Sequence, residues 1–217
     1  MPSLLLLDGS PRGPHSNTMK MLAQVKEGWE RGGGGPSETL HLAHPADFER
    51  ALAAFRTAGT VLLGMPLYTD AMPALVLAFL QALTPREQAG QLAFLVQSGF
   101  PEALHSRPLE RYLEKLAPRL GFGYAGTIVR GAGESLRAMP DQASRKLWER
   151  LRTLGGQLAR EGRFAPEDLR AVAGIERFRP LAAALLGLLF RLSVTQFYWN
   201  RQLKRNGAWP RRFARPY

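Results

Sequence analysis

The segment from Asp8 to Thr18 is rich in groups that can donate hydrogen bonds to a phosphate. It reads Asp-Gly-Ser-Pro-Arg-Gly-Pro-His-Ser-Asn-Thr and joins an apolar run to a long amphipathic run. Its hydroxyls, its guanidinium and the free backbone N–H groups expected at a helix start suit a phosphate. The segment lacks the G-x-x-x-x-G-K-[ST] pattern and its lysine, so we do not expect hydrolysis of a nucleoside triphosphate. The alternative is a purely structural helix start, capped by Ser16 or Asn17.

Three further loops follow predicted strands and carry aromatic, small and polar residues. The loop 65–73 is bounded by prolines and contains Tyr68, which can stack on a planar ring. The loop 97–102 combines small residues with a phenylalanine, and the loop 131–136 lacks the third glycine of a dinucleotide fingerprint. Parallel strands end at one edge of a sheet, where ligands bind. The four loops together therefore predict a ligand made of a phosphate attached to a flat ring.

The residue inventory excludes several kinds of active site. The 217 residues include no cysteine, which rules out disulfides, a cysteine nucleophile and cysteine-ligated metal or iron–sulfur sites. The four histidines lack the H-E-x-x-H spacing of a zinc hydrolase, and Ser10 lies outside any G-x-S-x-G elbow. We predict no metal site and no catalytic side chain, so redox chemistry would depend on a bound cofactor.

Short apolar runs alternate with longer amphipathic runs over the first 144 residues. We expect strands at 4–7, 40–42, 60–65, 92–96 and 124–129, and helices at 17–31, 47–55, 73–83, 108–120 and 144–160. This alternation is typical of an α/β fold. With right-handed crossovers it gives a three-layer, doubly wound, five-stranded parallel sheet.

The net charge of +11 belongs to the last third of the chain. Residues 1–144 hold 13 basic and 13 acidic residues, whereas residues 145–217 hold 16 basic and 5 acidic residues. The apolar run 181–190 is about half the length that spans a bilayer.

We expect residues 1–162 to form the ligand-binding domain and residues 163–217 to form a basic, apolar helical extension. It would pack on that domain or at a subunit interface; the alternatives are a membrane-surface element, a nucleic-acid arm or a solvated arginine-rich surface.

Motifs in three of the loops resemble those of the flavodoxin-like NAD(P)H-dependent FMN reductases. They are Gly9-Ser10-Pro11-Arg12 with Ser16-Asn17-Thr18, Pro66-Leu67-Tyr68 through Met72-Pro73, and Ser98-Gly99-Phe100-Pro101-Glu102. The ending Tyr198-Trp199-Asn200 to Leu203-Lys204-Arg205-Asn206-Gly207-Ala208, with Arg215-Pro216-Tyr217, resembles a tail in one branch of the family. The resemblance covers nearly the whole chain and implies the strand order 2-1-3-4-5. The iron–sulfur branch is excluded, because it needs cysteines.

The resemblance also assigns residues to the cofactor FMN. It implies that the FMN phosphate is held by Ser10, Arg12, Ser16, Asn17 and Thr18. The ribityl chain and ring would be lined by Pro66, Leu67, Tyr68 and Thr69, and closed on the far side by Ser98, Gly99 and Phe100.

The function implied is an FMN-dependent oxidoreductase with NAD(P)H as co-substrate. Electrons would pass through the flavin to a quinone, free flavin or another small acceptor. The many arginines favour NADPH, and we expect a homodimer, with peripheral membrane contact open and nucleic acid not expected. Asp8 comes too early for a signal-peptide core, which favours a cytoplasmic protein. The alternative is a flavodoxin-like binding or scaffold protein without turnover, docking on anionic membrane or nucleic acid through its basic third.

Overall fold

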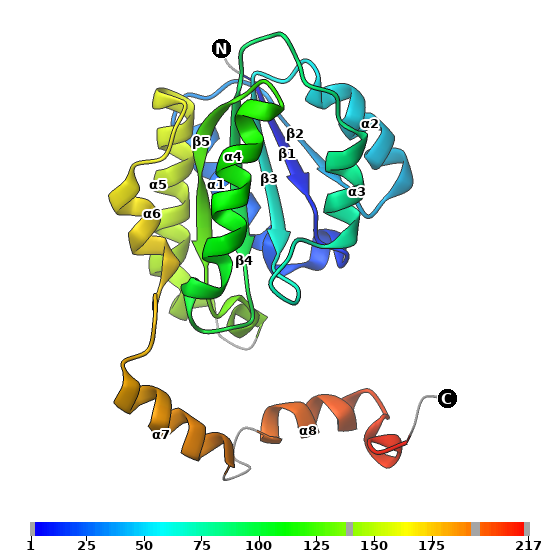
Figure 1. Ribbon diagram of the computed structural model, residues 1–217, viewed down its shortest axis with the longest axis vertical. Helices are drawn as coiled ribbons and strands as arrows, with labels where there is room; N and C mark the ends of the chain where they lie inside the picture. Colours follow the sequence, from blue (N-terminus) through cyan, green and yellow to red (C-terminus); the bar gives the residue numbers. More distant parts are fainter. Residues whose placement is uncertain (1–2, 138–140, 192–195, 215–217) are drawn as a thin grey trace. The chain divides into compact units, whose positions relative to one another are not determined.

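The computed structural model describes residues 3–137, 141–191 and 196–214 (Figure 1). The chain divides into two compact units, Met1–Glu176 and Arg177–Tyr217. The first unit contains the sheet and the helices that cover it, and the second contains the last helices of the chain.

Five parallel strands form one sheet in the order β2-β1-β3-β4-β5, which confirms the expected topology. The strands are β1 (Leu4–Asp8), β2 (Ser37–His41), β3 (Thr60–Pro66), β4 (Gln91–Gln97) and β5 (Gly123–Arg130). Every residue of β1 and β3 is buried. Central strands of a parallel sheet have this pattern because helices cover both of their faces.

Helices lie on both faces of the sheet and give the unit three layers (Figure 1). They are α1 (Asn17–Arg31), α2 (Pro45–Phe55), α3 (Ala74–Ala82), α4 (Arg107–Arg119), α5 (Arg145–Glu161) and α6 (Pro166–Ala173), with the short 3-10 helices η1 (Gly13–His15), η2 (Ala103–Ser106), η3 (Gly133–Arg137) and η4 (Asp141–Ser144). Successive residues of β1 point to opposite layers. Leu4 and Leu6 pack with α1 and α5, whereas Leu5 and Leu7 pack with α2, α3 and α4.

The first unit extends beyond the domain boundary predicted after residue 162. α6 packs against β5 and α5. Phe164 and Val172 are buried in the same core cluster as α1 and α5. The boundary between the units therefore follows Glu176, because residues 163–176 complete the cover of the sheet beside β5.

The end of the first unit is tied to the loop that follows β4. Ile175 forms a parallel bridge with Glu102. The Arg107 guanidinium donates through Nε to Glu176 Oε1 (2.9 Å) and through Nη2 to Glu176 Oε2 (2.6 Å). These bonds hold the pKa of Glu176 below its ordinary value and raise that of Arg107, so the pair is ionised near neutral pH.

The second unit is helical, as predicted for the end of the chain. It contains α7 (Pro180–Arg191), α8 (Gln196–Arg205) and η5 (Trp209–Arg211). Two cations lie over the Trp209 ring, with Arg212 Cζ at 4.1 Å and Lys204 Nζ at 5.1 Å from its centroid. None of the helices in the described ranges is long and apolar enough to cross a membrane. The last motif residues, 215–217, lie outside the described residues.

α1 and α5 cross so closely that only glycine fits at the contact. A Cβ on Gly28 would lie 1.9 Å from the Arg152 carbonyl oxygen, and a Cβ on Gly155 would lie 2.0 Å from the Val25 carbonyl oxygen. Backbone atoms in a packed interior cannot yield as a flexible side chain does. The crossing therefore sets the position of α1, whose first turn carries the polar residues of the candidate site.

Replacing Gly155 by alanine is expected to destabilise the protein by about 1–3 kcal/mol or more, because the new methyl group overlaps a carbonyl oxygen. Gly156→Ala is the matched control on the next residue. The atoms nearest to its Cβ would belong to the flexible Arg160 guanidinium, with Nη1 at 3.0 Å, and alanine favours the helix by about 0.5–1 kcal/mol. Urea unfolding of both variants measures the difference. Equal stability of the two variants would contradict the close crossing.

Candidate functional site

The carboxyl ends of the strands bring the four predicted loops to one edge of the sheet. In the parallel register Asp8 pairs with Gly64, Pro66 with Gln97, and Gln97 with Arg130. The segments that leave β1, β3, β4 and β5 therefore start side by side. This edge includes the β1/β3 boundary, where the winding direction reverses and ligands of such sheets bind.

The first loop buries four polar side chains around the start of α1. Ser10, Ser16, Asn17 and Thr18 are each at most 3% exposed. Ser16 is the N-cap, and its Oγ accepts a hydrogen bond from Met19 N (2.9 Å). The N–H groups of Asn17 and Thr18 have no acceptor within the part of the chain that the structure describes. The loop is thus both a capped helix start and a set of donors available to an anion.

The first loop is joined to the fourth through Asn17 and Arg12. Asn17 Nδ2 donates to Gly133 O (2.9 Å) and to Glu134 Oε2 (3.4 Å). The half-exposed Arg12 places Nη1 3.3 Å from the same Glu134 oxygen. The buried Oδ1 of Asn17 has no partner among the described residues. A carboxylate therefore contacts two of the side chains that are predicted to bind a phosphate. The sequence analysis gave no role to this residue of the loop 131–136.

The second loop begins in the core and becomes exposed from Tyr68 to Ala71. Pro66 and Leu67 are buried. Leu67 N donates to Gln97 O (2.7 Å), which ties this loop to β4. Tyr68 is 45% exposed, so its ring is available at the edge of the sheet.

A tight turn closes the second loop where the sequence predicted an irregular segment. Tyr68 N donates to Ala71 O (2.9 Å), and Ala71 N donates to Tyr68 O (3.0 Å). Thr69 and Asp70 have φ values of 47° and 63°. Residues other than glycine adopt this left-handed conformation at a cost of about 1–2 kcal/mol each. The predicted site residue Thr69 therefore lies at a strained tip.

The third and fourth loops are joined by backbone hydrogen bonds. Gly133 N donates to Ser98 O (2.7 Å). Ala132 N donates to Phe100 O (2.6 Å). The hydroxyl of the buried Ser98 also donates to Phe100 O (3.2 Å), which fixes the turn between them.

Gly99 and Phe100, in the third loop, are exposed. A Cβ on Gly99 would lie 4.0 Å from Glu134 Cβ, so the third loop passes beside the carboxylate. Phe100 is 48% exposed, and its ring centroid lies 4.6 Å from that of His105. Phe100 and Tyr68 thus give one edge two exposed aromatic rings.

Asp8 and the partly buried His41 form a hydrogen-bonded dyad that sequence reasoning missed. Asp8 is fully buried at the end of β1, and its Oδ2 lies 3.0 Å from His41 Nδ1 at the end of β2. Ser10 N donates to the other carboxylate oxygen (3.0 Å). Burial raises the pKa of Asp8, an effect larger than the lowering by its hydrogen bonds to His41 and Ser10. The β1/β2 register, which pairs Asp8 with His41, is the signal that could have revealed the dyad.

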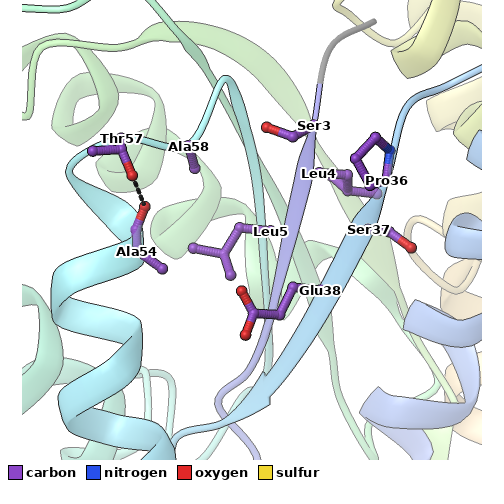
Figure 2. Close-up of a pocket in the computed structure, with 9 residues that line it drawn as sticks. All are labelled: Ser3, Leu4, Leu5, Pro36, Ser37, Glu38, Ala54, Thr57 and Ala58. Carbon is purple, nitrogen blue, oxygen red and sulfur yellow. Dashed lines mark hydrogen bonds between the residues drawn. The ribbon is translucent and has the colours of Figure 1, made fainter.

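A cavity of about 290 Å³ lies at the opposite edge, at the amino ends of β1 and β2 (Figure 2). It is lined by Ser3, Leu4, Leu5, Pro36, Ser37, Glu38, Ala54, Thr57 and Ala58. None of the predicted site residues lines it, and its one titratable side chain, Glu38, pairs with Arg50 (2.5 Å). Within the described ranges no group of His, Asp and Glu is arranged to hold a metal ion.

No protein-family model matches the chain, and no curated protein sequence does so significantly. Solved structures do match. An NADH:FMN oxidoreductase in its apo form superposes with a TM-score of 0.58 at 18% identity, over 84% of this chain and 99% of its own. The chain has the flavodoxin-like fold. Two further matches share this fold at low identity.

The first of these flavodoxin-like structures is an FMN-dependent NADH-azoreductase from Bacillus anthracis in complex with FMN. Its TM-score is 0.54 at 12% identity, over 73% of this chain and all of its own. The second is an NADPH-quinone reductase from P. pentosaceus, with a TM-score of 0.52 at 18% identity, over 74% of this chain and 99% of its own. At such identities the comparison establishes the architecture, and the chemistry must be argued from the site.

Asp8→Asn is expected to change the pH dependence of stability. The folded state holds the Asp8 proton more tightly than the unfolded state does, so the wild type loses stability as pH rises from the ordinary value of 3.8 through the raised pKa. An asparagine can keep both hydrogen bonds and does not ionise. The advantage of the variant over wild type should therefore grow with pH and then level off. Urea unfolding across this range is the measurement, and a constant difference would refute the buried carboxyl assignment.

Asp8→Ala is the companion variant. It leaves Ser10 N and His41 without their acceptor and should cost about 1–3 kcal/mol at neutral pH.

Proposed function

We propose that the protein is an FMN-dependent oxidoreductase that uses NAD(P)H to reduce a small acceptor. The observation that carries the proposal is the cluster of donors at the start of α1, on the same sheet edge as two exposed aromatic rings. Such an edge suits a ligand that joins a phosphate to a planar ring. An FMN-dependent NADH-azoreductase and an NADH:FMN oxidoreductase share this fold, which supports the proposal further.

The donor chemistry of the first loop fits the FMN phosphate. The phosphate would be held by Ser10, Arg12, Ser16, Asn17 and Thr18. Thr18 Oγ1 already accepts from Gln97 Nε2 (3.4 Å), which leaves its O–H to donate. Arg12 would exchange its contact with Glu134 for a stronger charge-assisted bond to phosphate.

The remaining predicted residues would line the isoalloxazine ring and ribityl chain. They are Pro66, Leu67, Tyr68 and Thr69 on one side and Ser98, Gly99 and Phe100 on the other. Bound FMN supplies the chemistry, accepting hydride from a nicotinamide and passing electrons onward. The protein's own part is to hold the phosphate, orient the ring and exclude water. We propose a quinone, free flavin or similar electrophile as acceptor, and NADPH as the favoured co-substrate.

The carboxylate of Glu134 favours a second candidate function, a flavodoxin-like binding protein without turnover. An acid that already contacts Arg12 and Asn17 opposes the entry of a phosphate. In this alternative the edge would keep its internal ion pair, and any flavin bound there would not be reduced by a nicotinamide nucleotide.

The visible spectrum of the purified full-length chain separates the two functions. An FMN-dependent oxidoreductase should carry or bind FMN, and NADH or NADPH should bleach its flavin absorbance under anaerobic conditions. A protein that neither carries nor binds FMN would overturn the proposal. Bound flavin that neither nucleotide reduces would favour the binding protein.

Arg12 and Glu134 should affect FMN affinity in opposite directions. Arg12→Ala removes a charge-assisted bond and should weaken FMN by about 1.5–3 kcal/mol, roughly 10- to 150-fold. Glu134→Gln removes a competing charge in a partly exposed pair and should tighten FMN by about 0.2–1 kcal/mol, up to roughly fivefold. Fluorescence titration with FMN measures both changes.

Arg31→Ala is the matched control for Arg12→Ala. Arg31 lies at the other end of α1 and pairs with Glu27 on the surface. Its replacement should leave FMN affinity unchanged. If Arg31→Ala and Arg12→Ala weaken FMN equally, Arg12 has no specific contact with the phosphate.

A further inference from the structure

All of the acidic residues of the chain lie in the first unit. Residues 177–217 contain nine Lys and Arg and no Asp or Glu, whereas residues 1–176 contain 20 basic and 18 acidic residues. The first unit is therefore close to neutral, and the second unit is uniformly cationic. A segment of this kind attracts a partner with negative charge.

The second unit also contains a helix with no polar side chain before its last residue. From Pro180 to Phe190, α7 consists of Leu, Ala, Gly, Phe and Pro residues. Leu181, Leu185 and Leu188 are 83%, 61% and 55% exposed. At positions i, i+4 and i+7 they form one apolar stripe along the helix.

The length of α7 excludes a span and suits an interfacial position. Its 12 residues extend about 18 Å, compared with about 30 Å for the bilayer core. A short apolar helix can lie in the plane of the interface and bury one face below the headgroups.

Basic and aromatic side chains accompany this helix. Arg201, Lys204 and Arg205 of α8 are exposed. Phe197 and Phe213 are also exposed, by 71% and 86%. Aromatic rings concentrate at membrane interfaces, and basic residues near them are attracted to anionic headgroups.

From this combination we infer that residues 177–217 dock on the surface of an anionic membrane. The leucine stripe of α7 enters the interface, and the cations of α8 and η5 bind lipid phosphates and carboxylates. A second copy of this segment would bring like charges together, and the nearly neutral first unit has no acidic excess to attract it. Nucleic acid phosphates could pair with the cations, but the leucine stripe of α7 would stay exposed to water.

Vesicle flotation of the full chain tests the inference. Vesicles of phosphatidylcholine with about one-third phosphatidylserine should bind the protein at least about tenfold more strongly than phosphatidylcholine alone. Raising NaCl from about 0.05 M to about 0.5 M should weaken this binding severalfold, because salt screens the cations. Equal binding to both vesicles, or none to either, would overturn the inference.

Charge-reversal variants locate the surface. Arg201→Glu, Lys204→Glu and Arg205→Glu together should reduce binding to anionic vesicles by about tenfold or more. The matched control reverses three exposed cations on α4, Arg111, Lys115 and Arg119, and should leave more of the binding intact. A larger loss in the control would move the docking surface to the first unit and overturn the inference.

The leucine stripe is tested separately. Leu181→Asn, Leu185→Asn and Leu188→Asn together should reduce vesicle binding at both salt concentrations without changing the unfolding of the first unit. Two outcomes would replace the membrane by another partner. One is a dimer in sedimentation that these asparagines dissociate, and the other is binding to duplex DNA that is tighter than binding to anionic vesicles.

Discussion

The parallel sheet of the first unit must be buried on both faces, because its central strands are apolar along almost their whole length. β1 sends alternate leucines into two separate cores, so helices are needed on each side of it. On one side this requires α1 and α5 to cross at glycines, with no room for a side chain between their backbones. The first turn of α1 is thereby held at the carboxyl edge. Burial of the β1 leucines requires α1 to pack on the sheet, and this packing places the backbone donors of Asn17 and Thr18 at the carboxyl edge.

The strands and the helices could be predicted because each depends on local pattern, whereas the strand order came from the family resemblance. Runs such as Leu4–Leu7 identify buried strands, and Gly9 to Thr18 identifies the capped start of a helix. The contacts that the sequence did not reveal join distant residues. Glu134 meets Asn17 across 117 positions, and Asp8 meets His41 across 33. Such pairs depend on register and loop path, which residue type and spacing do not encode.

The unit boundary after Glu176, instead of after residue 162, was missed for a related reason. It depends on Phe164 and Val172 filling space in the core beside α5, which are contacts between distant residues. The turn at Thr69 and Asp70 was missed because Thr69 is β-branched and rarely adopts left-handed backbone, although aspartate does so more often. By contrast, the convergence of four loops on one edge follows from parallel topology alone, which is why that expectation was accessible from sequence.

Two carboxylates give the candidate edge its electrostatic character. Asp8 is fully buried against His41, and burial raises its pKa. Glu134 is more exposed and remains beside Arg12. The Glu134 carboxylate therefore lies where the phosphate of a ligand is predicted to bind. Whether a phosphate replaces it depends on how strongly this partly exposed carboxylate holds Arg12.

The junction between the units gives the first unit a mechanical attachment point. Ile175 is bridged to Glu102, and Glu176 is clamped by Arg107, so the chain departs from the loop that also carries Phe100. A load applied to residues 177–217 would reach this loop before any other part of the sheet. Tension at the end of the chain would act first on residues 102–107, through the bridge, the ion pair and the backbone hydrogen bonds from Ala103 N to Ile175 O (2.8 Å) and from Leu104 N to Glu176 O (3.1 Å).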